Sequence, residues 1–323
     1  MSDADDLGRP READLSKVRT VPVTQRANKV ASAAEAKPPA VDLSFRSFLN
    51  SLPDVLQAQS FRSVVDAIVR AARDQRPVVV MLGGHVIKTG LAPLLIDLMR
   101  HRVITHLASN GSAVIHDYEM ARWGGTSEDV EAGLKDGSFG MATETGRDMN
   151  AAIAEGARNG WGLGESLARD LESRTDLAAA ESSLLLQSRK LGVQFTVHAA
   201  VGADIIHQHP NADGGAIGAT SFTDFKRLSA HLADLDDGVV LNIGSAVIMP
   251  EVFLKALTVC RNLNNGAPKA FVAADFDMIQ QYRPLVNVVQ RPTRSGGGKG
   301  YHITGHHEIM IPLLVWAVVD QLG

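Results

Sequence analysis

Short apolar runs and longer stretches with helical spacing of apolar residues alternate along most of this chain. The apolar runs have the length of buried strands, and we expect strands at 77–82, 104–108, 193–198, 238–243, 269–274 and 286–290. Helical spacing fills the intervals and predicts helices at about 89–100, from about 115, at 222–234, at 251–263 and at 309–322. Because strands separated by helices need crossover connections, this order predicts an α/β fold with a mainly parallel, doubly wound sheet.

The regions around this alternation have other patterns. Between Phe45 and Arg73 the apolar residues keep helical spacing, which predicts two helices broken near Pro53. Residues 1–40 are rich in Ala, Lys, Glu, Asp and Pro and lack apolar periodicity, so we expect a disordered tail. Residues 41–323 then form a single domain, with a helical insertion at about 127–190.

Composition and charge exclude several classes of function. The chain is 45% hydrophobic and 21% charged, as expected for an ordinary soluble globular protein. Its formal net charge of -4 argues against nucleic acid as a partner. No apolar run reaches the length of a membrane span, and the acidic N-terminus is followed by no hydrophobic stretch. We therefore expect no membrane partner and a cytoplasmic location.

Turns of small residues follow three of the expected strands. They are Gly83-Gly84, Ser109-Asn110-Gly111-Ser112 and Gly244-Ser245. Such pairs often form ordinary tight turns. In an open parallel sheet, however, the carboxyl ends of the strands lie along one edge, and ligands bind in the crevice there. The repetition at three strand ends favours a ligand cleft in which backbone N–H groups approach the ligand.

Histidines gather near the same turns. Of the 11 in the chain, seven lie there: His85, His116, His198, His207, His209, His306 and His307. Imidazoles can act in acid–base chemistry or hydrogen-bond a ligand. With Asp204 or Glu308, two of them could also hold a metal ion that activates water, although the spacing is not a known metal signature and we assign no metal ligands. Purely structural roles are the third interpretation.

Several motifs, taken in order over roughly residues 76–320, resemble the deoxyhypusine synthase family. The most specific is the turn at 109–112 followed by His116-Asp117 at a helix start. Others lie at 84–90, at 201–206, which contains Asp204, at 243–247 and at 305–314. The resemblance implies a Rossmann-like NAD-binding fold and a homotetramer with sites at subunit interfaces.

The same resemblance implies roles for individual residues. His116, with Asp117, would be the acid–base group, and Asp204 would anchor the ammonium group of a small amine. NAD would be bound at the turns by Gly83, Gly84, His85, Ser109, Asn110, Gly111, Gly244, Ser245 and His306.

The chain departs from the family where the family's imine-forming lysine should stand. That lysine belongs to a Trp-Gly-Lys triplet, where this chain has Gln290 and Pro292, and Lys299 is the nearby substitute. Glu251 stands where the family places a catalytic histidine. We therefore expect NAD-dependent oxidation of, or aminoalkyl transfer from, a small amine or polyamine, and not modification of a protein. The alternatives are an NAD-independent hydrolase that uses the histidines, with or without a metal, and a non-catalytic ligand-binding or assembly protein.

Overall fold

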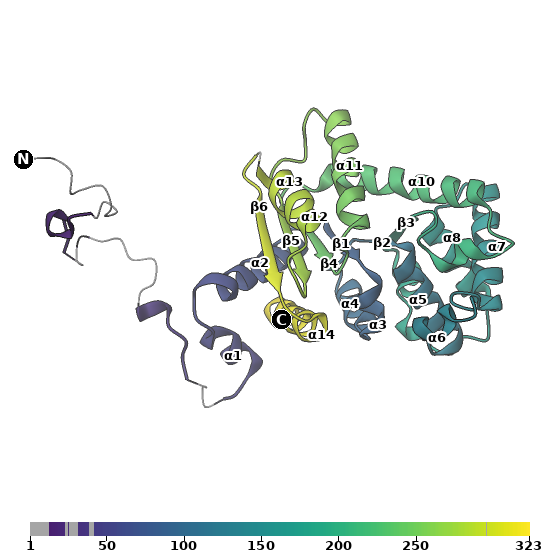
Figure 1. Ribbon diagram of the computed structural model, residues 1–323, viewed down its shortest axis with the longest axis horizontal. Helices are drawn as coiled ribbons and strands as arrows, with labels where there is room; N and C mark the ends of the chain where they lie inside the picture. Colours follow the sequence, from purple (N-terminus) through teal and green to yellow (C-terminus); the bar gives the residue numbers. More distant parts are fainter. Residues whose placement is uncertain (1–12, 23–24, 26–31, 39–41, 295) are drawn as a thin grey trace, which may run out of the picture.

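The computed structural model describes residues 13–22, 25, 32–38, 42–294 and 296–323, and these are organised around one six-stranded sheet (Figure 1). Every neighbouring pair of strands is parallel, and the order is β3-β2-β1-β4-β5-β6. The strands are β1 Val78–Leu82, β2 His106–Asn110, β3 Gln194–His198, β4 Val239–Ile243, β5 Val272–Asp277 and β6 Lys299–Thr304. The expected parallel, doubly wound α/β fold is confirmed.

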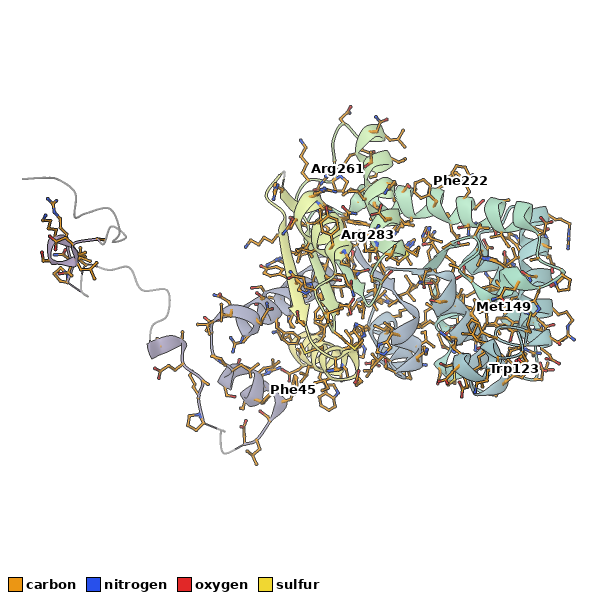
Figure 2. All side chains as sticks on the ribbon, viewed as in Figure 1. Phe45, Trp123, Met149, Phe222, Arg261 and Arg283 are labelled. Atoms are coloured by element: carbon orange, nitrogen blue, oxygen red, sulfur yellow. The ribbon has the colours of Figure 1, made fainter. Side chains whose placement is uncertain are left out.

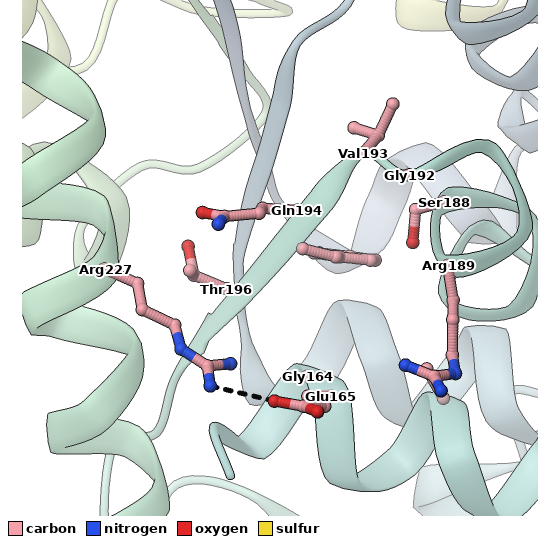
Figure 3. A pocket seen from close by; sticks show the side chains of 11 residues that line it. Gly164, Glu165, Ser188, Arg189, Gly192, Val193, Gln194, Thr196 and Arg227 are labelled. Carbon is pink, nitrogen blue, oxygen red and sulfur yellow. Dashed lines mark ion pairs between the residues drawn. The ribbon is translucent and has the colours of Figure 1, made fainter.

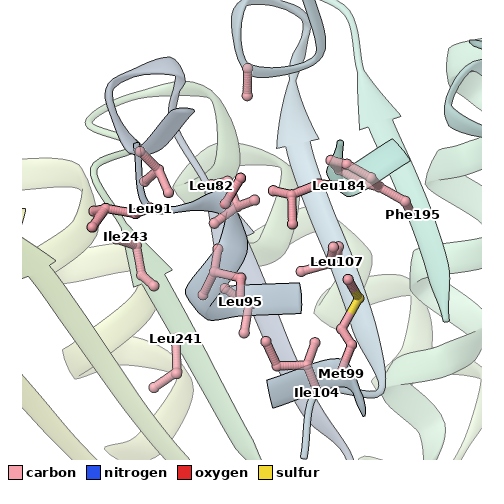
Figure 4. Close-up of a cluster of buried hydrophobic side chains, with 14 of the residues drawn as sticks. Leu82, Leu91, Leu95, Met99, Ile104, Leu107, Leu184, Phe195, Leu241 and Ile243 are labelled. Atoms are coloured by element: carbon pink, nitrogen blue, oxygen red, sulfur yellow. The ribbon is translucent and has the colours of Figure 1, made fainter. Parts of the chain in front are cut away.

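The central strands are apolar along their whole length because helices cover both faces of the sheet. All five residues of β1, and all five of β4, are buried. Side chains alternate between the faces, so Val80 and Leu82 enter one core and Val79 and Met81 enter the other. Figure 4 shows part of the first core, where Leu82 lies among side chains that include Leu95 and Leu107.

The helices divide between these two cores. The first core includes residues of α2 Leu56–Arg73, α4 Ala92–Arg100, α5 Gly111–Trp123 and α14 His307–Leu322. The second includes residues of α10 Gly214–His231, α11 Ile248–Leu263 and a π-helix, η7 Leu285–Gln290. Side chains fill the space between the sheet and these helices (Figure 2). The chain therefore winds along one face of the sheet and then along the other.

The direction of winding reverses between β1 and β4. The chain leaves β1 for β2 on one side, whereas β4 pairs with β1 on the other side. In open parallel sheets, ligands usually bind at the carboxyl ends of the two strands where the strand order reverses. Helices α3 Gly84–Lys88, α5 and α14 begin at this edge, directly after β1, β2 and β6 (Figure 1).

A group of helices lies between β2 and β3, beginning with α5. It continues with α6 Val130–Leu134, α7 Thr143–Asn159, α8 Leu163–Ser173, the 3-10 turn η4 Ala180–Ser182 and α9 Leu184–Leu191. Ion pairs join α5 to this group, and Arg122 lies 3.5 Å from Asp148 and 2.5 Å from Asp176. Arg174 binds both Asp148, at 3.2 Å, and Asp170, at 2.6 Å. The buried charges are therefore paired and fix α5 against α7 and α8.

The N-terminal helices agree with the apolar spacing. Helix α1 spans Phe45–Ser51 and is capped by Ser44, and α2 begins at Leu56, so the expected break near Pro53 is confirmed. In the expected tail, 3-10 turns occur at Leu15–Lys17 and Ser32–Ala34. Residues 1–12, 23–24, 26–31 and 39–41 lie outside the described residues, so disorder of the tail and the domain boundary at 41 stay predictions. Among the described residues, no helix has both the length and the apolar character that crossing a membrane requires.

The strand expected at 286–290 is wrong. This valine-rich segment is η7, which lies between the short helices α12 Tyr282–Pro284 and α13 Arg291–Arg294. The sixth strand is instead β6, whose residues are mostly polar or glycine and mostly exposed or half-buried. Packing decided the outcome, because Val288 enters the second core while β6 pairs with β5 as an edge strand.

The remaining connections are short. They include the 3-10 turns η5 Ile205–Gln208, after β3, and η6 Leu232–Asp234, after α10. Helix α10 is capped by Asp213, whose carboxylate accepts the N–H groups of Gly215 and Ala216. Turn η5 brings Asp204, its N-cap residue, to the carboxyl edge of the sheet beside α5.

Candidate functional site

The glycine turns after β1 and β4 touch each other at the point where the strand order reverses. The N–H of Gly83 donates to the carbonyl of Ile243 at 3.0 Å. A Cβ placed on Gly83 would lie 2.0 Å from the carbonyl oxygen of Gly244, and one on Gly244 would lie 2.7 Å from Cε1 of His307. Gly244 also has a φ of +66°, which disfavours any side chain. Glycine is therefore required at both positions for the turns to meet.

A second contact joins the starts of α3 and α5 to the segment after β3. A Cβ on Gly84 would lie 2.8 Å from Oγ of Ser112, and one on Gly111 would lie 2.0 Å from Oδ2 of Asp204. The glycine at 111 thus makes room for the Asp204 carboxyl group at the positive end of α5. The expected turns and Asp204 come together at one edge of the sheet.

A pocket of about 230 Å³ opens beside this second contact. It is lined by α3, by α5, by the segment between α5 and α7, and by residues 203–205. Its ionisable groups are one lysine, one histidine and three carboxyl groups: Lys88, His116, Glu119, Glu128 and Asp204. The excess of carboxyl groups suits a ligand that carries positive charge.

His116 is held in one tautomer by a relay of hydrogen bonds. The Thr126 hydroxyl donates to Oε2 of Glu119 at 2.5 Å, so its oxygen accepts the Nδ1–H of His116 at 2.7 Å. The other carboxylate oxygen of Glu119 accepts the hydroxyl of Thr145 at 3.0 Å. Burial, with a smaller contribution from Lys88, lowers the pKa of His116 to about 4. At neutral pH the ring is therefore uncharged, and Nε2 is the nitrogen available to a ligand.

Asp204 is buried beside this histidine with few partners. Burial raises its pKa to about 6. It accepts a backbone hydrogen bond from Ala200, and Nε2 of His207, whose pKa burial lowers, lies 3.9 Å from its Oδ2. A cationic ligand would stabilise the ionised form and gain a charged hydrogen bond.

Asp117 follows His116 in the sequence but lies away from the pocket. Its carboxylate accepts the hydroxyl of Ser183 at 2.8 Å and the N–H groups of Leu184 and Leu185 at 2.7 and 3.0 Å. It thereby holds the first turn of α9. The interior position of Asp117 suits a structural role.

Two other expected catalytic residues are also separate from the pocket. Lys299 begins β6, at the amino-terminal edge of the sheet and therefore opposite the pocket. Glu251 lies in the first turn of α11 and interacts with Lys255, with Asn287 at 2.8 Å and with Arg283 at 3.3 Å. Arg283 is labelled in Figure 2. The structure thus does not bring these two side chains together with His116.

Three of the expected cofactor residues, Ser109, Asn110 and Ser245, hydrogen-bond the backbone, whereas His306 is exposed. Asn110 caps α5 by accepting the N–H of Ala113 at 3.3 Å, and the buried Ser109 hydroxyl donates to the Asn110 carbonyl. The Ser245 hydroxyl accepts the N–H of Met249 at 3.2 Å, at the start of α11. His306 is exposed and lies 3.7 Å from Glu308. Glu119 was not predicted from the sequence, although its spacing of three residues from His116 places both on one helix face.

Two further observations limit where the site can be. Within the described ranges, no three His, Cys, Asp or Glu side chains are grouped so as to hold a metal ion. A larger cavity of about 330 Å³ lies beside Gln194 of β3, between α8 and α10, where Glu165 pairs with Arg227 at 2.8 Å (Figure 3). It adjoins the first residues of the edge strand, away from the turns, so we place the candidate site at the carboxyl edge.

Comparison with known proteins supports the fold. The sequence matches no family model and no curated protein. The structure is similar to AgrE, solved with ornithine and NAD+, with a TM-score of 0.51 and 16% identity over 82% of this chain. This chain covers 33% of the length of AgrE.

Two other solved structures share the architecture. One is assigned as a deoxyhypusine synthase from Entamoeba histolytica, with a TM-score of 0.52 and 9% identity over 88% of this chain and 96% of that one. The other is assigned as a LOR/SDH protein from Methanococcus maripaludis S2, with a TM-score of 0.50 and 12% identity over 83% and 71% of the two chains. These likenesses show a deoxyhypusine-synthase-like fold.

Proposed function

We propose that this chain is an NAD-dependent enzyme that acts on a small amine, with the amine bound in the pocket beside α5. The observation that carries the proposal is the placement of three carboxyl groups, Glu119, Glu128 and Asp204, around an uncharged His116. Carboxylates hold an ammonium group, and a neutral imidazole accepts a proton from it. Solved neighbours that include AgrE with ornithine and NAD+ agree with an amine-processing enzyme.

We infer that the dinucleotide would bind at the carboxyl edge of the sheet. The positive end of α5 lies there, and the glycine turns at 83–84 and 244 place no bulky side chain at the carboxyl ends of β1 and β4. NAD would be held by Gly83, Gly84, His85, Ser109, Asn110, Gly111, Gly244, Ser245 and His306. When bound, it would accept a hydride from the carbon next to the amine nitrogen.

The protein's own groups would prepare the amine for that chemistry. Asp204 and Glu128 would bind the ammonium group, and Nε2 of His116 would take one of its protons. Lys88, at the same pocket, would bind a carboxylate if the substrate is an amino acid such as ornithine. Because Lys299 lies at the opposite edge of the sheet, we place oxidation ahead of aminoalkyl transfer through that lysine.

The test is calorimetry with NAD, followed by the appearance of NADH fluorescence with candidate amines. We expect NAD binding and turnover with 1,4-diaminobutane, spermidine or ornithine, and the comparison of ornithine with 1,4-diaminobutane reports on Lys88. Absence of binding at millimolar NAD would overturn the cofactor assignment. Amide or ester hydrolysis without NAD would favour a hydrolase, and NAD binding without any turnover would favour a ligand-binding protein.

Assembly is a separate part of the proposal. The resemblance to deoxyhypusine synthases suggests a homotetramer with sites at subunit interfaces. Light scattering of the purified chain would give the mass directly. A monomer that still binds NAD would show that each chain forms a complete site.

A further inference from the structure

A pair of histidines lies at the reversal of strand order, outside the pocket of His116. Nδ1 of His85, in α3, lies 2.9 Å from Nδ1 of His307, the first residue of α14. The two rings have centroids 5.2 Å apart and are tilted by 57°. His307 is buried and His85 is half-buried. The pair joins the end of β1 to the end of β6.

The hydrogen bonds of His307 fix its tautomer. Its Nε2 lies 3.0 Å from the carbonyl oxygen of Phe276, in β5. A carbonyl can only accept, so Nε2 of His307 carries the hydrogen and Nδ1 is an acceptor. Cε1 of His307, the ring carbon between the two nitrogens, faces Gly244. A Cβ placed on Gly244 would lie 2.7 Å from this atom. His307 is therefore enclosed on three sides and has no freedom to turn over.

The tautomer of His85 follows from that of His307. If Nδ1 of His307 is an acceptor, Nδ1 of His85 must carry the hydrogen and donate it. Nε2 of His85 then has a free lone pair, and among the described residues no group forms a hydrogen bond with it. Burial, followed by the neighbouring His307, lowers the pKa of His85 and keeps the ring neutral.

We infer that His85 is a second proton acceptor, whose Nε2 takes a proton from an ammonium or hydroxyl group of a ligand at the carboxyl ends of β1 and β4; this ligand rests on the proposed function. In this step the ligand's N–H or O–H bond breaks, its electron pair stays on the ligand's nitrogen or oxygen, and an Nε2–H bond forms, so that His85 becomes an imidazolium. His307 is the positioning residue, because it accepts the Nδ1–H throughout and is itself oriented by the Phe276 carbonyl. The charge that develops lies near the carboxylates of Asp277 and Glu308, which oppose the nearby Lys88.

The relay of hydrogen bonds from His85 through His307 to the Phe276 carbonyl does not require NAD, so it can be tested without any turnover. The full chain is labelled with 15N-histidine, and long-range 1H–15N correlation spectra identify each tautomer, with His85→Asn assigning the signal. We expect the Nδ1–H tautomer for His85 and the Nε2–H tautomer for His307. An Nε2–H tautomer of His85 would overturn the inference even if NAD binds as proposed.

A matched pair of variants tests the positioning role. In His307→Gln the amide can accept from His85 and donate to Phe276, so the Nδ1–H tautomer of His85 should persist. In His307→Leu the acceptor is lost, and we expect the Nε2–H tautomer to become the major form. An unchanged tautomer in a folded His307→Leu would contradict the relay, and so would loss of the Nδ1–H form in His307→Gln.

The ligand class is tested with 1,4-diaminobutane and 1,4-butanediol, which differ only in the donor group. Either compound, at millimolar concentration, should move the Nε2 signal of His85 toward that of a protonated nitrogen, and the stronger effect identifies the donor. The same titration with His85→Asn is the control for other histidines. If neither compound moves the signal of His85, the proton-acceptor role is wrong.

Discussion

Two buried carboxyl groups next to helix α5, those of Asp117 and Asp204, have different surroundings. On one face, Asp117 accepts three hydrogen bonds from Ser183 and the start of α9. On the other, Asp204 of the segment after β3 lies against Gly111 at the pocket wall, and a backbone N–H, that of Ala200, is its hydrogen-bond donor. Burial raises the pKa of both carboxyl groups to about 6. The pKa shift that Asp117 and Asp204 share therefore does not distinguish a structural carboxyl group from one proposed to bind a ligand. The number of hydrogen bonds that each carboxyl group accepts does distinguish them.

The strongest test of this difference is Asp117→Ala. It leaves two backbone N–H groups and a hydroxyl buried without an acceptor, so we expect the free energy of unfolding to fall by about 4 kcal/mol. Denaturant unfolding measures that loss. The folded fraction should bind 1,4-diaminobutane with unchanged affinity, and a variant that keeps its stability but loses the amine would place Asp117 in the site.

The pocket face is tested next by Gly111→Ala. Because the new Cβ would lie 2.0 Å from Oδ2 of Asp204, either the carboxyl group or α5 must move. We expect a loss of stability of about 3 kcal/mol and at least about a tenfold weaker affinity for 1,4-diaminobutane, about 1.4 kcal/mol. Gly125→Ala is the matched control, since nothing lies within 4 Å of a Cβ there. Equal effects of the two substitutions would show that the Gly111 contact is unimportant.

Asp204→Asn separates affinity from stability. The pKa of Asp204 is raised from 3.8 to about 6 on folding, so the wild-type fold loses stability as the pH rises from about 4 to about 6. Asparagine does not titrate, and the variant should gain about 2 kcal/mol relative to wild type over that interval. Asp117 titrates in the same way in both proteins, so its contribution to the difference in stability cancels.

The same variant should bind 1,4-diaminobutane less tightly, because the charged hydrogen bond is lost. Unfolding curves at several pH values, together with calorimetry at pH 7.5, measure both effects. A stability difference that does not change with pH would mean that Asp204 is already ionised in the fold.

The smallest expected effect is that of Thr126→Val. It removes the acceptor for the Nδ1–H of His116 and the donor to Glu119, and we expect about a fivefold weaker amine affinity, or about 1 kcal/mol. NMR of the labelled histidine should show loss of the Nδ1–H tautomer. Thr126→Ser keeps the hydroxyl and should retain both properties; if it behaves like the valine variant, the relay does not orient His116.

The sequence predicted the sheet well because its central strands are continuous apolar runs between helices. It misplaced the sixth strand, since the valines at 286–289 favour a strand by propensity, while the burial of Val288 in the second core is a tertiary effect. The converging turns followed from their positions at strand ends. The separation of His116 from Asp117 could not be predicted from the sequence, because it depends on which face of α5 contacts α9. The acceptor role of Thr126 could not be predicted either, because it depends on contacts across a loop.

The outer wall of the pocket comes from a segment that contributes little to either core. Ser127, Glu128, Val130 and Phe139 lie between α5 and α7, where most residues are exposed. His116 and Asp204, by contrast, are fixed to the sheet through α5 and the end of β3. Mutation or grafting of residues 127–140 can therefore alter ligand preference while the core that folds the chain and the Thr126 contact to His116 are kept, which makes this segment the natural place for directed evolution of specificity.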